Sequence, residues 1–201
     1  EIGNQSVQIF SPSGLNASFN FERNGNKVIS GLPGGLLEFD EDVVVTIASG
    51  VDFGPSITTI NASLELLPGA FVNNNAPIYG PEGVLIYNTG SPGYNRRAEW
   101  NGTEGTAGFP NDVIIRSNTF VSAAAVSGYD TTPLQLRRDL IIENDATLIM
   151  DLSGNGMQEP LVIGRNMILD GNLQGSDRVG GDIEISGDWI QTGETFPKRV
   201  S

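Results

Sequence analysis

The sequence predicts an all-β protein built as a right-handed parallel β-helix, a solenoid whose short strands stack from coil to coil. Runs of β-branched and aromatic residues are broken about every 8 to 12 residues by Gly, Asn, Asp or Pro, as in all-β proteins. No run keeps a 3.6-residue apolar period, so helix is not expected. Ile114, Ile141 and Ile168 follow one another in equal steps of 27 residues (141 − 114 and 168 − 141), which suits one coil of a solenoid.

Asparagine recurs just after the apolar runs. Because Asn tolerates left-handed backbone, we expect these residues at the tight corners of the coils. They are Asn61, Asn88, Asn118, Asn144, Asn166 and Asn172. The alternative fold is a β-sandwich or jelly roll, but its antiparallel strands would be longer and would alternate cleanly between apolar and polar residues.

The expected elements divide the chain into two parts. Residues 1–35 hold the strands Val7–Phe10, Ala17–Phe21 and Lys27–Ile29, which form an N-terminal cap or the end of a preceding repeat. Residues 36–201 form the solenoid module, with a loop inserted at 88–112. Short apolar runs predict its strands: 36–39, 43–47, 51–53, 56–60, 64–67, 70–72 and 83–87 before the loop, then 113–115, 140–142, 148–150, 161–163, 167–169, 183–185 and 189–190.

Composition limits the partners. The 201 residues carry a formal charge of −13, which argues against binding to nucleic-acid phosphates or to anionic membranes. Charged residues make up only 17% of the chain, a low share that is typical of secreted β proteins. Cys and His are both absent, which removes thiolate and imidazole chemistry. No apolar stretch is long enough to cross a bilayer, so no membrane insertion is expected.

The central motifs resemble a known family. They read Leu85-Ile-Tyr-Asn-Thr-Gly90, Tyr94-Asn-Arg96, Glu99-Trp100 and Gly108-Phe-Pro-Asn-Asp-Val113, and the tail 181–200 continues the pattern. Together they resemble β-helical segments of very large surface proteins and adhesins of Bacteroidetes-type bacteria, which the type IX secretion route exports. The resemblance covers residues 36–201. It implies one repeat of a longer glycoprotein that serves in surface adhesion or gliding motility, and it brings no catalytic residues.

The loop Tyr94–Trp100 is the densest cluster of aromatic and charged residues in the chain. Tyr94, Arg96, Arg97, Glu99 and Trp100 could form a glycan platform, in which an exposed ring stacks on a sugar and the charged groups bond its hydroxyls. The alternative is packing, with Trp100 and Tyr94 covering the core edge and an Arg orienting the loop through Glu99.

Two acidic turns are candidate calcium sites. Asp151, Ser153 and Asn155 follow the first positions of a calcium loop, but Val162 stands where a bidentate Glu belongs. Asp40, Glu41 and Asp42 form another oxygen-rich turn. No other cofactor is expected. Thr131, in the motif Asp130-Thr-Thr132, resembles an O-glycosylation site of proteins exported by the same bacteria.

The predicted function is a non-catalytic structural or adhesive module of a secreted bacterial cell-surface protein. Its partners would be neighbouring repeats, a fibre or extracellular polysaccharide. One alternative is a carbohydrate-binding module that uses the Tyr94–Trp100 loop. A second is a calcium-assisted polysaccharide lyase or hydrolase, for which the C-terminal acids Asp170, Asp177, Asp182 and Asp188 with Arg178 would be the groups to use.

Overall fold

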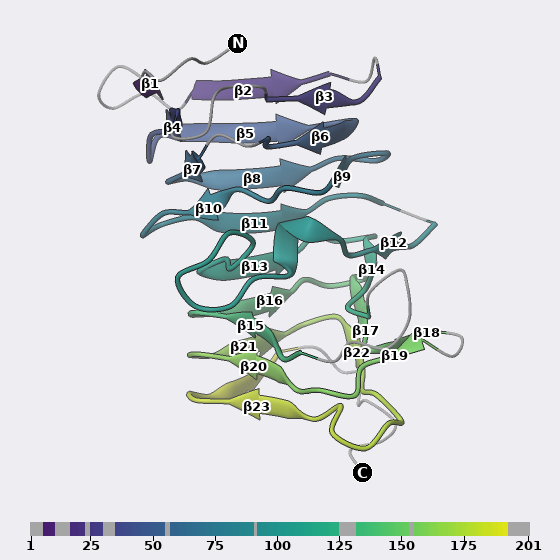
Figure 1. Cartoon of the computed structure of the whole chain (residues 1–201). Helices are drawn as coiled ribbons and strands as arrows, with labels where there is room; N and C mark the ends of the chain where they lie inside the picture. The colour runs from purple at the N-terminus through teal and green to yellow at the C-terminus, as the bar shows by residue number, and fades with distance from the viewer. Residues whose placement is uncertain are drawn as a thin grey trace.

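The computed structural model describes residues 6–10, 17–22, 25–29, 35–54, 57–90, 92–124, 132–152 and 155–192. Within these ranges the chain is a parallel β-helix with no α-helix, and its coils stack along one axis (Figure 1). The predicted fold class is therefore confirmed. The described residues also contain no helix long and apolar enough to span a membrane.

One eight-stranded parallel sheet, which we call the long sheet, runs the length of the stack. Each of its strands pairs only with the strands of the coils on either side. In stacking order it contains β2 (Ala17–Phe21), β5 (Val43–Ile47), β8 (Ser63–Leu66), β11 (Val84–Tyr87), β13 (Asp112–Ile115), β16 (Leu140–Ile142), β21 (Met167–Leu169) and β24 (Trp189–Gln191).

The side sheets change half-way along the stack. The first coils carry two side sheets. One contains β1 (Ser6–Ile9), β4 (Leu36–Phe39), β7 (Ile57–Ile60) and β10 (Ile78–Tyr79). The other contains β3 (Lys27–Val28), β6 (Gly50–Asp52) and β9 (Phe71–Val72). The later coils carry two other side sheets. One contains β12 (Tyr94–Asn95), β14 (Phe120–Ser122), β17 (Thr147–Ile149) and β22 (Asn172–Gln174). The other contains β15 (Leu134–Leu136), β20 (Leu161–Ile163) and β23 (Ile183–Ile185). A short antiparallel pair, β18 (Asp151–Leu152) and β19 (Asn155–Gly156), projects from one coil.

The changeover falls at the coil that carries the inserted loop. β9 and β10 are the last strands of the first two side sheets, and β12 begins the next one. The loop contains the only helical turn of the described residues, the 3₁₀ helix η1 (Ala98–Trp100). The long sheet passes through this level without a break, because β11 pairs with β8 above and β13 below.

Strand register builds the core as stacks of one residue per coil. One stack on the long sheet joins Phe19, Val45, Leu64, Leu85, Val113, Leu140, Met167 and Trp189. The six inner members are fully buried, whereas Phe19 and Trp189 at the two ends keep 37% and 41% of their surface exposed. Burying each inner side chain contributes about 1.5–3 kcal/mol, so the stacks make a large favourable contribution to folding.

The 27-residue repeat is confirmed by the register, in which Ile114 pairs with Ile141 and Ile141 with Ile168. These isoleucines lie on the outer face of the long sheet, since the half-buried Ile114 alternates with the buried Val113 and Ile115. Other coils differ in length. The shortest step is the 19 residues from Val45 to Leu64 (64 − 45), and the longest is the 28 residues from Leu85 to Val113 (113 − 85).

The corner asparagines act mainly through their side chains. Of the six predicted, only Asn118 has left-handed backbone, with φ of 60°. Asn61 and Asn88 instead donate from Nδ2 to glutamate carboxylates on the preceding coil, Glu38 at 2.8 Å and Glu65 at 3.0 Å. The expectation of left-handed corners is wrong at the other five, none of which has positive φ.

A ladder of Asp and Asn side chains joins the later coils at the start of the long-sheet strands. The Asp112 carboxylate accepts the Asp139 N–H at 2.9 Å, Asp139 accepts the Asn166 N–H at 3.0 Å, and Asn166 accepts the Asp188 N–H at 3.0 Å. Arg138 and Arg165 add ion pairs to Asp112 and Asp139 respectively. Each rung thus satisfies a backbone donor that the sheet itself leaves open.

The N-terminal strands belong to the same stack. β1, β2 and β3 pair in parallel with β4, β5 and β6, so these three strands add one more level to the solenoid.

Replacing Asp139 should weaken the ladder in a pH-dependent way. The Arg165 guanidinium and the Asn166 N–H outweigh burial and hold the pKa of Asp139 below its ordinary value. A lowered pKa contributes stability above the unfolded-state pKa of about 3.9 that is lost as pH falls. We expect Asp139→Ala to lower the free energy of unfolding by about 1–2 kcal/mol at neutral pH and by less at pH 3, measured by urea denaturation.

The matched control is Asp182→Ala, because that side chain is exposed. Equal losses for the two variants at neutral pH would contradict a structural role for the ladder.

Candidate functional site

The inserted loop touches all four side sheets at their changeover. Its residues contact Phe71 of β9 and Tyr79 of β10, where two sheets end, and Tyr94 and Gln135, where two sheets begin. Tyr94 lies on β12 and Gln135 on β15. The densest polar cluster in the chain therefore lies where the solenoid changes its cross-section.

Glu99 is the centre of this cluster. Its side chain is fully buried, and its Oε1 accepts three hydrogen bonds, from the hydroxyls of Tyr87 (3.1 Å) and Tyr94 (3.0 Å) and from the Arg97 N–H (2.9 Å). The backbone oxygen of Glu99 accepts a fourth, from the Tyr79 hydroxyl at 2.9 Å. One residue thus joins the three strands of a single coil, β10, β11 and β12.

Burial controls the protonation of this group. The pKa of Glu99 is raised because burial penalises the carboxylate, and the hydrogen bonds it accepts offset only part of that effect. Burial and the nearby Glu99 also raise the pKa of Tyr87 and of Tyr94, so both phenols stay hydrogen-bond donors. The second oxygen, Oε2, is buried without a hydrogen-bond partner, which favours the neutral acid over the carboxylate.

Arg96 and Trp100 hold the loop from its other side. The buried Arg96 donates from Nε to the Ala123 carbonyl, and from Nη1 to the Trp100 carbonyl at 2.8 Å and to Asn101 Oδ1 at 2.9 Å. The indole N–H of Trp100 donates to the Gln135 carbonyl at 2.7 Å, and its ring is fully buried. The loop is therefore bonded to the coil below as well as to its own coil.

Two further contacts close the loop. The Arg97 guanidinium lies 4.3 Å from the centre of the Phe71 ring, a cation–π contact with β9. Gly108 has φ of 77°, donates its N–H to the Pro77 carbonyl, and accepts from the N–H groups of Asn101 and Gly102. A Cβ at Gly108 would stand 2.6 Å from the Ala98 carbonyl oxygen, so only glycine fits there.

The structure brings all five predicted loop residues together, but as a packed network. Trp100, Arg96 and Glu99 are buried, Tyr94 is half-buried, and only Arg97 is exposed. Trp100 does not offer the exposed stacking ring that a glycan platform needs, because it is fully buried beside Tyr87, with ring centres 6.4 Å apart.

Sequence reasoning missed Tyr79 and Tyr87. Alignment of the strands could have identified Tyr87 as a buried residue, since its partners on the neighbouring strands, Leu66 and Ile115, are apolar core residues. A phenol in a core stack needs a buried acceptor, and Glu99 is that acceptor.

The predicted calcium turns show no cluster of three acidic side chains in the residues that the structure describes. At the first turn, Asp40 Oδ1 accepts the Glu41 N–H, and Glu41 is exposed. At the second, the Asp151 carboxyl hydrogen-bonds that of Asp177, which raises the pKa of Asp151. Asn155 pairs with Leu152 through the backbone, while Ser153 and the predicted glycosylation site Thr131 lie outside the described residues.

The C-terminal acids proposed for catalysis lie apart from one another. Asp188 continues the ladder on the long sheet, and Asp177 pairs with Arg178 at 3.3 Å beside Asp151. Asp170 follows β21, and the exposed Asp182 precedes β23. All four lie within the one coil between β21 and β24, so their spacing reflects the successive corners of that coil.

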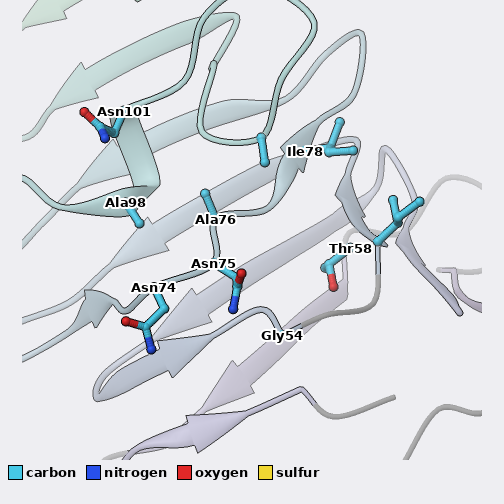
Figure 2. A pocket seen from close by; sticks show the side chains of 10 residues that line it. Gly54, Thr58, Asn74, Asn75, Ala76, Ile78, Ala98 and Asn101 are labelled. Carbon is cyan, nitrogen blue, oxygen red and sulfur yellow. The ribbon is translucent and has the colours of Figure 1, made fainter. Parts of the chain in front are cut away.

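A pocket of about 360 Å³ opens beside the loop (Figure 2). It lies between η1 with its following residues and the corner Asn74–Ala76, which joins β9 to β10. It was not among the predicted sites, because its residues come from three separate stretches of sequence.

The variant Glu99→Gln should gain stability relative to the wild type as pH rises. Because the folded-state pKa of Glu99 is raised, the contribution of Glu99 to stability is fully present at acid pH and is lost as pH rises through that pKa. Glutamine does not titrate and keeps an oxygen for the tyrosines, so the difference in unfolding free energy should grow with pH, by at most about 1.4 kcal/mol per unit. Urea denaturation between pH 4 and pH 9 measures it.

Glu104→Gln is the control within the same loop, since Glu104 is exposed. A pH-independent difference between wild type and Glu99→Gln would show that Glu99 does not titrate in this range.

Trp100→Ala should destabilise the fold strongly. Removing a fully buried indole and its hydrogen bond to Gln135 should cost about 3–5 kcal/mol, measured by thermal and urea unfolding. Trp189→Ala is the matched control, because Trp189 is 41% exposed and should cost much less. An unchanged melting temperature for Trp100→Ala would contradict the packing role.

No protein-family model matches the chain, and the searches of curated proteins and of solved structures found no match either.

Proposed function

We propose that this chain is a non-catalytic structural module, a stalk or adhesive segment, of a secreted bacterial cell-surface protein. The observation that carries the proposal is the use of the aromatic and charged loop. Glu99, Arg96 and Trp100 are buried and bonded to neighbouring strands, so the residues best suited to recognition or chemistry brace the solenoid instead.

The ends of the stack support the same function. Phe19 and Trp189 belong to a core stack whose inner members are fully buried, yet each is more than a third exposed. Backbone groups along the outer edges of β2 and β24 have no strand partner among the described residues. Such edges suit stacking on further coils, as in a longer repetitive protein or a fibre. The resemblance to large surface adhesins fits this role.

Self-association through the ends tests the proposal. In sedimentation velocity, we expect the wild-type chain to form head-to-tail oligomers as its concentration rises, and Trp189→Glu to keep it monomeric. A charge at this position disfavours burial against a second coil.

Ile141→Glu is the control, because it adds the same charge to the side of the stack. A wild type that stays monomeric at high concentration, or an equal effect of both variants, would contradict stacking through the ends.

A further inference from the structure

The pocket beside the inserted loop has one wall from the first half of the solenoid and one from the loop. β7 and β10 contribute Ile57, Thr58 and Ile78, and the loop contributes Ala98 and Asn101. In Figure 2 the corner residues Asn74 and Asn75 lie between these walls. At about 360 Å³ the pocket is near the lower end of the range of small-molecule sites, roughly 300–1,000 Å³.

The amides of Asn74 and Asn75 have a fixed orientation. Both donate from Nδ2 to the Asp52 carboxylate, at 3.0 Å and 2.7 Å, and the Gly54 N–H donates to it at 2.9 Å. Burial alone would raise the pKa of Asp52, but these hydrogen bonds lower it, so the group stays a carboxylate that only accepts. The two amide nitrogens must therefore face Asp52, which leaves each Oδ1 as an acceptor on the other end of the group.

Asn101 is oriented in the opposite sense. Its Oδ1 accepts from Arg96 Nη1 at 2.9 Å, and a guanidinium can only donate. Its Nδ2 is therefore directed away from Arg96 as a donor. The residues that line the pocket thus include two amides whose oxygens remain as acceptors and one whose nitrogen remains as a donor, beside small apolar side chains.

The pocket is neutral in a chain of net charge −13. Among the described residues that line it, none is ionisable and none is aromatic. Those lining residues offer no Lys or Arg to pair with an anionic ligand and no Asp or Glu to pair with a cationic one. Hydroxyl groups, which both donate and accept, match the amides, and the alanines and isoleucines match the C–H faces of a sugar ring.

We propose that this pocket binds neutral carbohydrate, about one or two sugar units of a glycan. No aromatic ring stacks on the sugar, so the affinity per site is weak, with a dissociation constant of about 1 mM. Repetition along a longer protein or fibre would turn weak single sites into firm attachment. A structural role for the module holds whether or not the pocket binds sugar.

The test is a ¹H–¹⁵N NMR titration with neutral oligosaccharides of glucose, of mannose and of xylose, up to about 10 mM. At least one series should shift the side-chain amide signals of Asn74, Asn75 and Asn101. Asn101→Asp keeps an oxygen for Arg96 but removes the amide donor, so it should weaken binding about 5- to 10-fold. Ala107→Trp should fill the pocket and abolish binding.

Gln174→Trp is the control for the added indole, because Gln174 is exposed on β22 in the later coils; it should bind as the wild type does. Thermal unfolding checks that each variant is folded. The inference is overturned if no neutral series shifts these amides, if only an anionic oligosaccharide does, or if both pocket variants bind as tightly as the wild type.

Discussion

In-register stacking of parallel coils is the constraint on which the rest of this structure depends. Each coil must return the chain to the same position on the long sheet, or the apolar stacks and the backbone hydrogen bonds between coils are lost together. Extra residues can therefore enter only at corners. The step between successive long-sheet strands varies from 19 to 28 residues, yet every step returns an apolar residue to the stack of Val113.

The longest step carries the inserted loop, which lies where the side sheets change. At that level the ending strands β9 and β10 and the starting strands β12 and β15 cannot bond to one another as successive sheet members. Glu99, Arg96 and Trp100 supply the missing cross-links through side chains. A buried acid is a costly way to do this, but a carboxyl oxygen can accept from two phenols and a backbone N–H at one point, as Glu99 does.

The sequence predicted the architecture well because short strands, turn residues and the 27-residue step are local signals. It predicted the composition of the loop cluster, and it left open whether those residues recognise a ligand or pack. The changeover could not be predicted, since it depends on which corner segments pair across coils. The pocket could not be predicted either, because only the path of the loop brings Asn74 and Asn101 to the same pocket. The hydrogen bonds of Asn61 and Asn88 to glutamates were missed for the same reason, as their partners lie 23 residues away.

The opposite positions of β1–β3 and β23 along the stack (Figure 1) determine how the module responds to mechanical tension. A pull along the axis peels coils off one at a time, because the parallel strands of each coil pair only with those of its neighbours. Force would then break a few hydrogen bonds at once, and the chain would lengthen in steps. At the level of Glu99 and Trp100, side chains tie the loop to its own coil and the next. Peeling from either end would stop at this level, and the module would act as two extensible segments around a stiffer centre.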